Sequence, residues 1–342
     1  MKIPATVITG FLGAGKTTLI RHLLSRANGT RIAILINEFG DRGIDRDLLL
    51  GCGDTNCRDD DIVELANGCI CCTVADEFVP TMEKLLARDP LPEHIIIETS
   101  GLALPKPLVQ AFNWPEIRTR LTVDGVIALI DAPALADGRF ADDPDRVQAE
   151  RAADPALSHP SPLVELFEDQ LACADLVVLN KSDLVDKLTL ATLQQDLAAR
   201  VGNGTKVIAT RQGALDPRVA LGLAAAAETS IGHRRCHHDE DGEEDHDHDE
   251  FASFIATFGA VSDPEAVEQR IRTVAAAHDV LRVKGFLHVA DKPRRHVVQA
   301  VGGRIERYYD RAWVDGEQRR SELVVIGKKG LDRDAVAAVL TA

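Results

Sequence analysis

The chain carries no surplus of positive charge. Among its 342 residues, acidic side chains outnumber Lys and Arg by 54 to 39, which gives a formal net charge of −15 at pH 7. Proteins that bind nucleic acids or anionic lipids use Lys and Arg to neutralise phosphate groups. The charge balance argues against both classes, so we expect neither a nucleic-acid partner nor a membrane partner.

Signals for export and for membrane insertion are also missing. No segment is long and apolar enough to cross a bilayer. The short apolar run at residues 3–9 leads directly into a glycine-rich motif, without the basic region and small-residue cleavage site of a signal peptide. We therefore expect a cytoplasmic protein, whose seven cysteines are reduced and available for metal or redox chemistry.

The glycine-rich motif GFLGAGKT, residues 10–17, matches the phosphate-binding P-loop pattern G-x-x-x-x-G-K-[ST]. A strand pattern precedes it and a helix pattern follows, an arrangement that directs the free N–H groups of a helix N-terminus at a phosphate. We expect Lys16 to reach the β- and γ-phosphates and the Thr17 hydroxyl to bind Mg²⁺. The expected nucleotide-binding residues of this motif are Gly10, Gly13, Ala14, Gly15, Lys16, Thr17 and Thr18.

Strand and helix patterns alternate through residues 1–230. Apolar runs predict buried strands at residues 3–9, 31–37, 94–99, 126–131, 176–179 and 206–209, and amphipathic patterns predict helices at 75–88, 102–113, 163–174 and 188–200. This alternation is typical of an α/β P-loop NTPase with a mostly parallel sheet between helices. Residues 137–162 are polar and acidic, and we expect little regular structure there.

An abrupt change of composition divides the chain into a nucleotide-binding domain at 1–230, an acidic His-rich linker at 231–250 and a smaller domain at 251–342. The linker cannot form an apolar core. It holds five of the eleven histidines, and it either binds transition metals weakly or only solvates the connection. Patterns at 251–258, 264–277, 280–290, 296–301, 304–313, 322–326 and 332–340 predict a small C-terminal α+β domain. His288 and His296 in it are expected to be ordinary strand residues.

Two acidic residues follow predicted strands. Glu98 ends the 94–99 run, where a carboxylate facing a P-loop can hold Mg²⁺ or its waters, and Gly101 can offer its N–H to the γ-phosphate. Glu38, in the segment Asn37-Glu38-Phe39-Gly40, can reach the same ion. The alternatives are a surface acid at the strand end and a solvated acid in a loop.

The sequence Asn180-Lys181-Ser182-Asp183 follows the 176–179 run and matches the guanine-binding motif of GTPases. A carboxylate at Asp183 can accept hydrogen bonds from the ring N1–H and the 2-amino group of guanine, and adenine has no matching pair of donors. Asn180 and Lys181 are expected to support the base and the P-loop. We therefore expect GTP rather than ATP as the bound nucleotide.

Cys69, Cys71 and Cys72 form a C-x-C-C cluster after an Asn-Gly turn signal. Thiolates bind Zn²⁺, Co²⁺ or Cu⁺ and not Mg²⁺, so metal binding is favoured over redox use and over simple packing. The cluster lacks four obvious ligands, and an ion could leave such an open site. Cys52 and Cys57 lie in a polar, glycine-containing stretch that is either a second metal loop or a surface loop.

The motifs GFLGAGKTT, NEFG, NGCICC, ETSG and NKSD together resemble those of the CobW-type metallochaperone GTPases, in particular the branch of cobalamin biosynthesis. The resemblance covers nearly the whole chain. It implies that Cys69, Cys71 and Cys72 bind a metal beside the nucleotide, and that Thr17, Glu38 and Glu98 surround Mg²⁺ or orient water. It also implies a catalytic set of Lys16, Glu38 and Glu98, with GTP hydrolysis coupled to metal release.

For the cobalamin branch, the resemblance implies Co²⁺ as cargo and a cobaltochelatase as client. Three rival hypotheses stay open: a GTPase that delivers Zn²⁺ to another metalloprotein, a metal buffer or sensor that does not use hydrolysis, and a maturation factor for a metalloenzyme such as a nitrile hydratase. The oligomeric state is not indicated by the sequence.

Overall fold

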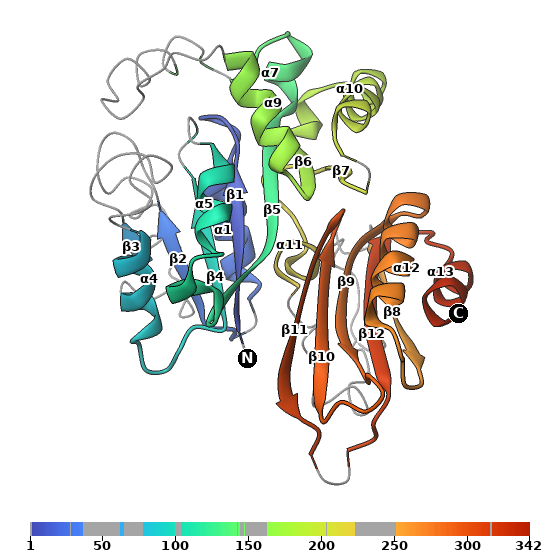
Figure 1. The fold of residues 1–342 in the computed structure, drawn as a ribbon. Coiled ribbons are helices and arrows are strands. Elements are labelled where there is room, and N and C mark those ends of the chain that lie inside the picture. The colour runs from blue at the N-terminus through green and yellow to red at the C-terminus, as the bar shows by residue number, and fades with distance from the viewer. Residues whose placement is uncertain are drawn as a thin grey trace, which may run out of the picture. The chain divides into compact units, whose positions relative to one another are not determined.

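The computed structural model describes residues 2–27, 29–36, 62–64, 78–99, 101, 104–141, 143, 147, 163–202, 204–222, 251–314 and 317–342. The chain divides into two compact units, Met1–Leu215 and Asp216–Ala342 (Figure 1). No helix among the described residues combines the length and the apolar character needed to cross a membrane.

In the described part of the first unit, seven parallel strands form one sheet in the order β3-β2-β4-β1-β5-β6-β7 (Figure 1). The strands are β1 (Ile3–Thr9), β2 (Ile32–Ile36), β3 (Ile62–Glu64), β4 (His94–Glu98), β5 (Leu121–Asp131), β6 (Leu176–Asn180) and β7 (Lys206–Ala209). All side chains of β2, β4, β5 and β6 are buried, as expected of a parallel sheet with both faces covered. The predicted α/β class is confirmed.

The helices of the first unit are α1 (Lys16–Ser25), α4 (Val79–Leu86), α5 (Pro105–Ala111), α6 (Pro115–Arg118), α7 (Ala132–Ala136), α9 (Leu163–Cys173) and α10 (Lys187–Arg200), with a short 3₁₀ turn, η3 (Ser182–Leu184). Apolar side chains of α4, α5 and α6 share one core cluster with β1, β2, β4 and β5. Those of α9 and α10 share a second cluster with β5, β6 and β7. Phe11 of the P-loop belongs to this second cluster, so the loop is anchored in the core.

Several elements of the first unit differ from expectation, among them β3 and α7, which were not predicted. β5 begins at Leu121, whereas the sequence predicted a start at residue 126. The prediction was too short because the polar residues Thr122 and Asp124 interrupt the apolar pattern, although both side chains are buried. The expected helix at 102–113 is shorter, and a separate turn of helix, α6, follows it with Pro115 in its first turn. Proline is favoured at the first position of a helix, so Pro115 marks this new start.

The second unit contains a five-stranded antiparallel sheet in the order β11-β10-β9-β12-β8. Its elements are α11 (Pro217–Leu221), β8 (Phe251–Phe258), α12 (Pro264–Ala277), β9 (Val280–Leu287), β10 (Arg294–Val301), β11 (Arg304–Ala312), β12 (Ser321–Lys328) and α13 (Arg333–Thr341). Apolar residues of α12 and α13 pack with the sheet in one cluster, and Figure 1 shows both helices beside the sheet. The predicted α+β class of this region is confirmed.

Helix α11 is part of the second unit and was not predicted. Its signal is visible in the sequence, because Asp216 followed by Pro217 is a typical helix start, and the Asp216 side chain accepts a hydrogen bond from the Arg218 N–H at 2.8 Å. The buried Arg282 of β9 donates to the carbonyls of Val219 (3.0 Å) and Ala220 (2.9 Å). These bonds satisfy carbonyl groups at the end of α11 that the short helix leaves unpaired.

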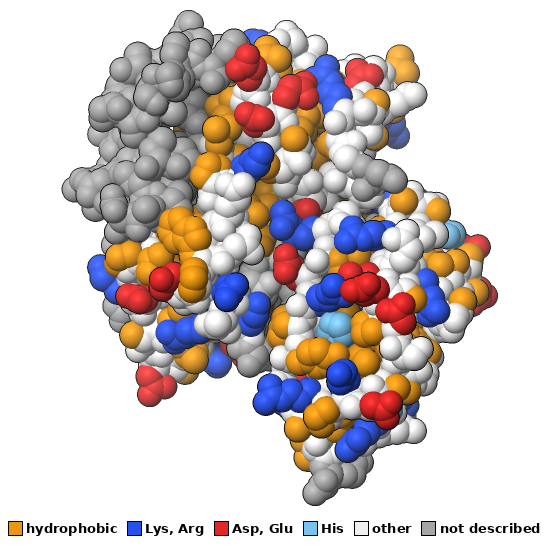
Figure 2. All heavy atoms as spheres, viewed as in Figure 1, with side chains coloured by type: hydrophobic (Ala, Val, Ile, Leu, Met, Phe, Trp, Pro, Cys, Tyr) orange, Lys and Arg blue, Asp and Glu red, His pale blue; other side chains and the backbone are white. Residues whose placement is uncertain are grey.

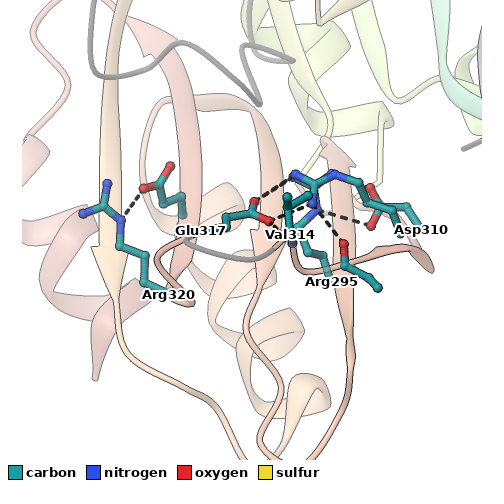
Figure 3. Close-up of polar contacts among 8 residues, drawn as sticks. Arg295, Asp310, Val314, Glu317 and Arg320 are labelled. Atoms are coloured by element: carbon teal, nitrogen blue, oxygen red, sulfur yellow. Dashed lines mark hydrogen bonds and ion pairs between the residues drawn. The ribbon is translucent and has the colours of Figure 1, made fainter.

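A network of charged residues joins β10, β11 and the segment before β12 (Figure 3). Arg295 pairs with Asp310, and both side chains are almost fully buried. Arg311 binds the two oxygens of Glu317 at 2.7 and 2.8 Å, and the Val314 N–H donates to the same carboxylate at 2.8 Å. The hydrogen bonds from Arg311 are the largest cause that lowers the pKa of Glu317 from 4.5 to about 2.

The lowered pKa of Glu317 predicts how stability depends on pH. A carboxyl with a depressed folded-state pKa stabilises the fold fully above its ordinary pKa of 4.5, and this contribution is lost as the pH falls toward about 2. Replacing Glu317 with Gln should therefore lower the free energy of unfolding at pH 7, and the deficit should shrink between pH 4.5 and pH 3.

Urea unfolding of the wild type and the Glu317→Gln variant at several pH values measures this difference. The matched control is Glu265→Gln, since Glu265 is 76% exposed and its ion pair with Arg307 is long, at 3.5 Å. A deficit for Glu317→Gln that stays constant from pH 7 to pH 3 would contradict the prediction.

Candidate functional site

Several strands of the first-unit sheet end along one edge, and each ends in or next to a polar residue. β4 ends at Glu98, β5 at Asp131 and β6 at Asn180. In register, Ile8 of β1 pairs with Glu98, and Asp131 pairs with Asn180. The strand order reverses at β1, with β2 to β4 on one side and β5 to β7 on the other. Open α/β sheets bind ligands beyond the carboxyl ends of their strands at such a reversal.

The P-loop leaves β1 at this edge and enters α1. Its backbone depends on glycine: a Cβ on Gly10 would lie 2.1 Å from the Leu129 carbonyl oxygen, and one on Gly15 would lie 2.5 Å from the Asn180 side-chain nitrogen. Gly15 precedes α1 with φ 98° and caps it without a side chain. The first N–H groups of α1 are therefore not covered by a capping side chain, which is the geometry that binds phosphate.

Lys16, the first residue of α1, lies across the loop. Its Nζ donates to the carbonyl of Gly10 at 3.0 Å and lies 4.0 Å from the Glu98 carboxylate, and both side chains are buried. The structure therefore brings the expected P-loop lysine and the expected acid at the end of β4 to the same point. With the α1 N-terminus, this set offers a cation for phosphate oxygens and a carboxylate oxygen suited to Mg²⁺.

Gly101 packs directly on the P-loop, because a Cβ at this position would lie 2.7 Å from the backbone nitrogen of Leu12. Its carbonyl accepts a hydrogen bond of 3.2 Å from Gln170 of α9. Gln170 was not identified from the sequence. Gln170 could have been noticed as a polar residue on the apolar face of a helix, where its buried neighbours are Leu166, Phe167 and Leu171. A buried amide needs a hydrogen-bond partner, and the Gly101 carbonyl provides one.

Asn180 connects three loops through one buried side chain. Its Nδ2 donates to the carbonyl of Ala14 in the P-loop at 2.8 Å, and its Oδ1 accepts from the Gly213 N–H at 3.0 Å. Gly213 in turn lies against α1, since a Cβ there would meet the Leu19 backbone nitrogen at 2.7 Å. The loop after β7 is therefore held next to both the P-loop and the Asn180 motif.

Lys181 and Asp183, two further residues of the Asn180–Asp183 motif, differ in exposure. Lys181 has a left-handed backbone (φ 57°), and its ammonium forms an ion pair of 2.6 Å with Asp131 at the end of β5. Asp183 lies in η3 with an exposed side chain, as a residue that contacts a ligand from solvent must be. Asp131 was not identified from the sequence, where it stood only as the end of a predicted strand.

The remaining predicted site residues lie outside the described residues: Glu38, Cys69, Cys71 and Cys72, together with Cys52, Cys57 and the His-rich tract. The strands before two of these motifs are described. β2 ends at Ile36, which is in register with Glu98 of β4 on one side and with Glu64, the last residue of β3, on the other. The chain therefore leaves both strands at the edge where the P-loop lies.

His288 and His296 of the second unit each lie against an aromatic ring. The His296 ring in β10 stacks on Tyr309 with centroids 4.7 Å apart, and the His288 ring meets Trp313 edge-on at 5.5 Å. Burial, followed by the charge of Arg307, lowers the pKa of His296. Charges of both signs are interspersed over the face of this unit drawn in Figure 2. Within the described ranges, no group of three or more His, Cys, Asp or Glu residues could hold a metal ion.

Comparison with known proteins gives two family matches. Residues 4–208 match the model described as CobW/HypB/UreG, nucleotide-binding domain, and residues 251–342 match the cobalamin synthesis protein cobW C-terminal domain. The chain is 56% identical, over all of its length and 97% of the relative's, to the zinc chaperone CobW of a Sinorhizobium species. It is 50% identical to the zinc chaperone CobW of Pseudomonas aeruginosa, over 98% of this chain and 90% of that one. It is 30% identical to the zinc chaperone YjiA of Escherichia coli, over 95% and 94% of the two chains.

The contact between Gly15 and Asn180 predicts the effect of one added methyl group. In the Gly15→Ala variant, the new Cβ would lie 2.5 Å from the Asn180 Nδ2 and displace it from the Ala14 carbonyl. We expect nucleotide affinity to fall by at least about tenfold, a loss of about 1.4 kcal/mol.

The matched control is Gly29→Ala. Gly29 also has a positive φ (80°), but a Cβ there meets nothing within 4 Å. Both variants place a Cβ at a positive φ, at a cost of about 1–2 kcal/mol, so the control shows whether such strain by itself lowers nucleotide affinity. Isothermal titration with nucleotide and Mg²⁺ measures the affinity of each variant, and equal affinities of the two variants would refute the assignment.

Proposed function

We propose that this chain, which belongs to the CobW/HypB/UreG family of nucleotide-binding proteins, hydrolyses GTP. It uses the cycle of GTP binding and hydrolysis to load and release a transition-metal ion. The observation that carries this proposal is the common edge of the sheet. Ile36, the last residue of β2, is in register with Glu98 of β4 on one side and with Glu64, the last residue of β3, on the other. In the sequence, the NEFG segment follows Ile36 directly and the NGCICC segment follows Glu64 closely.

Guanine selection rests on the segment from Asn180 to Asp183. The exposed carboxylate of Asp183 can accept from both N1–H and the 2-amino group of guanine. Asn180 fixes this segment to the P-loop through the Ala14 carbonyl, so base and phosphate sites are held at a constant separation.

Phosphate binding and hydrolysis rest on Lys16, Thr17, Glu38, Glu98 and Gly101. We expect the Lys16 ammonium to exchange the Gly10 carbonyl for β- and γ-phosphate oxygens when the nucleotide binds. Thr17 and Glu98 supply oxygen atoms suited to Mg²⁺, with Glu38 as a further candidate. Mg²⁺, when bound, withdraws charge from the phosphate oxygens. Glu38 and Glu98 are the candidates to orient the attacking water, and Gly101 offers its N–H to the γ-phosphate.

The cargo of the proposed cycle is a divalent ion held by the thiolates of Cys69, Cys71 and Cys72. The printed names of the relatives, zinc chaperone in each case, favour Zn²⁺. Co²⁺, delivered to a cobaltochelatase, stays the alternative because thiolates accept both ions. The client is in either case a protein that needs the metal for its own site.

GTP can control such a site only if the metal binds more tightly in the GTP state than in the GDP state. The γ-phosphate would contact Gly101 and the Mg²⁺ ligands, which end or follow β1, β2 and β4, and these strands lie in the same sheet as β3, the strand that precedes the metal motif. Loss of the γ-phosphate removes those contacts and favours release of the metal. Because thiolates must lose their protons to bind, loading should also weaken as pH falls.

Optical titration of the reduced protein with Co²⁺ tests the coupling. With GTP and Mg²⁺ present, we expect strong thiolate-to-Co²⁺ absorption that is weak with GDP and absent in the Cys69/Cys71/Cys72→Ser variant. The matched control is Cys173→Ser, because Cys173 ends α9 and is not part of the motif. Subsequent displacement by Zn²⁺ compares the two candidate cargoes. Equal binding without nucleotide, or binding that survives the triple substitution, would reject the nucleotide-gated site.

Substitution of Asp183 tests the choice of base. In the Asp183→Asn variant, the amide can no longer accept both guanine hydrogen bonds, so GTP affinity should fall by at least about a hundredfold. Xanthine carries a carbonyl oxygen where guanine carries the 2-amino group, and the new amide can donate to it. Xanthosine triphosphate should therefore become the better ligand.

The matched control for this substitution is Asp186→Asn. Asp186 is also exposed and caps α10, a role that asparagine performs equally well. Competition binding with GTP, ATP and xanthosine triphosphate measures the preference of each variant. An unchanged preference for GTP in Asp183→Asn would remove this residue from the site.

A further inference from the structure

We infer that Asp131 is a positioning residue for guanine binding, which it supports by holding the ammonium group of Lys181. The inference rests on the proposed function, because it takes the Asn180–Asp183 segment to be the guanine site. Asp131 belongs to none of the nucleotide-binding motifs of the chain. It ends β5, the strand that lies between the P-loop strand β1 and the strand β6 that leads into the guanine motif.

The position of Asp131 follows from sheet register. Asp131 and Asn180 are paired residues at the ends of neighbouring parallel strands. Lys181 is the next residue, and its left-handed backbone turns the chain into η3. The side chain of Lys181 meets Asp131 in an ion pair of 2.6 Å. No other strand of the described sheet lies between these two ends, so the pairing is a direct consequence of the β5–β6 register.

The Asp131 carboxylate is itself held in place. Its Oδ1 accepts a hydrogen bond of 3.0 Å from the Ala134 N–H and so caps α7, while its Oδ2 pairs with Lys181. Its side chain is only 2% exposed, whereas that of Lys181 is 28% exposed. A buried carboxylate is costly unless it is paired and hydrogen-bonded. Here the helix N-terminus binds one oxygen by a hydrogen bond and the ammonium forms an ion pair with the other, so the carboxylate is held from two sides.

This hold on the carboxylate matters because a lysine side chain is flexible. A free Lys181 would lose much of its rotamer freedom when the nucleotide binds, and this loss would weaken binding. Pairing with Asp131 restricts the side chain before the nucleotide arrives, which is a gain by preorganisation. Asp131 thus acts on the nucleotide through Lys181, without a contact of its own being required.

The test separates the ion pair from the helix cap. Asparagine is as good an N-cap as aspartate, so Asp131→Asn keeps the cap on α7 and removes only the negative charge. We expect about tenfold weaker binding of GTP and of GDP, equivalent to about 1.4 kcal/mol. We also expect a raised KM for GTP hydrolysis with little change in kcat, since the pair acts on binding and not on the phosphates.

A double-mutant cycle with Lys181→Met decides whether the effect passes through Lys181. We expect Lys181→Met to weaken GTP binding as well, and Asp131→Asn to cause no further loss in the Lys181→Met background. Asp131→Ala, which removes the cap too, should lower the melting temperature more than Asp131→Asn. All affinities are measured on the full-length protein by isothermal titration with GTP, GDP and ATP in the presence of Mg²⁺.

Three results would overturn the inference. The first is wild-type GTP affinity in Asp131→Asn. The second is a full additional loss in the double variant, which would show that Asp131 acts independently of Lys181. The third is a Lys181→Met variant with unchanged GTP affinity. A separate result is a wild-type protein that binds ATP as well as GTP. That last result rejects the proposed guanine site itself, and is distinguished from the other three because it does not depend on any variant.

Discussion

The amide of Asn180 is the contact on which the rest of the site depends. It uses both of its ends at once, donating to the Ala14 carbonyl in the P-loop and accepting from the Gly213 N–H in the loop after β7. The side chain is 2% exposed, so loss of either partner would leave a buried polar group without compensation. This requirement fixes the distance between the P-loop and the Asn180–Asp183 segment.

The parallel sheet explains why the polar residues of the candidate site lie along one edge. Because both faces of the strands are covered, nearly every position within them is apolar, and polar residues can serve a ligand only where strands end. Glu98, Asp131 and Asn180 are the last residues of β4, β5 and β6. A second set of contacts then holds these ends in place: Gln170 of α9 binds the Gly101 carbonyl, and Asp131 binds Lys181. The motifs supply the candidate site residues, and these supporting contacts hold them in position.

The sequence predicted those elements and site residues whose pattern lies in neighbouring positions of the chain. The apolar run that became β1 (Ile3–Thr9) and the glycine spacing of the P-loop need no distant partner to be recognised. Asp131 and Gln170 could not be identified in that way, because their roles depend on Lys181 and Gly101, which only the folded sheet brings beside them. The early start of β5 was missed for a related reason: Thr122 and Asp124 are polar, and their burial is decided by tertiary packing. Helix α11 had a local signal at Asp216-Pro217, so it could have been predicted from the sequence.

The connection between the two units begins at the same contact. Gly213, bonded to Asn180, is followed by the buried Leu215 and then by Asp216, which caps α11. The carbonyls of α11 are bound by Arg282, so this helix is fastened to β9 of the second unit.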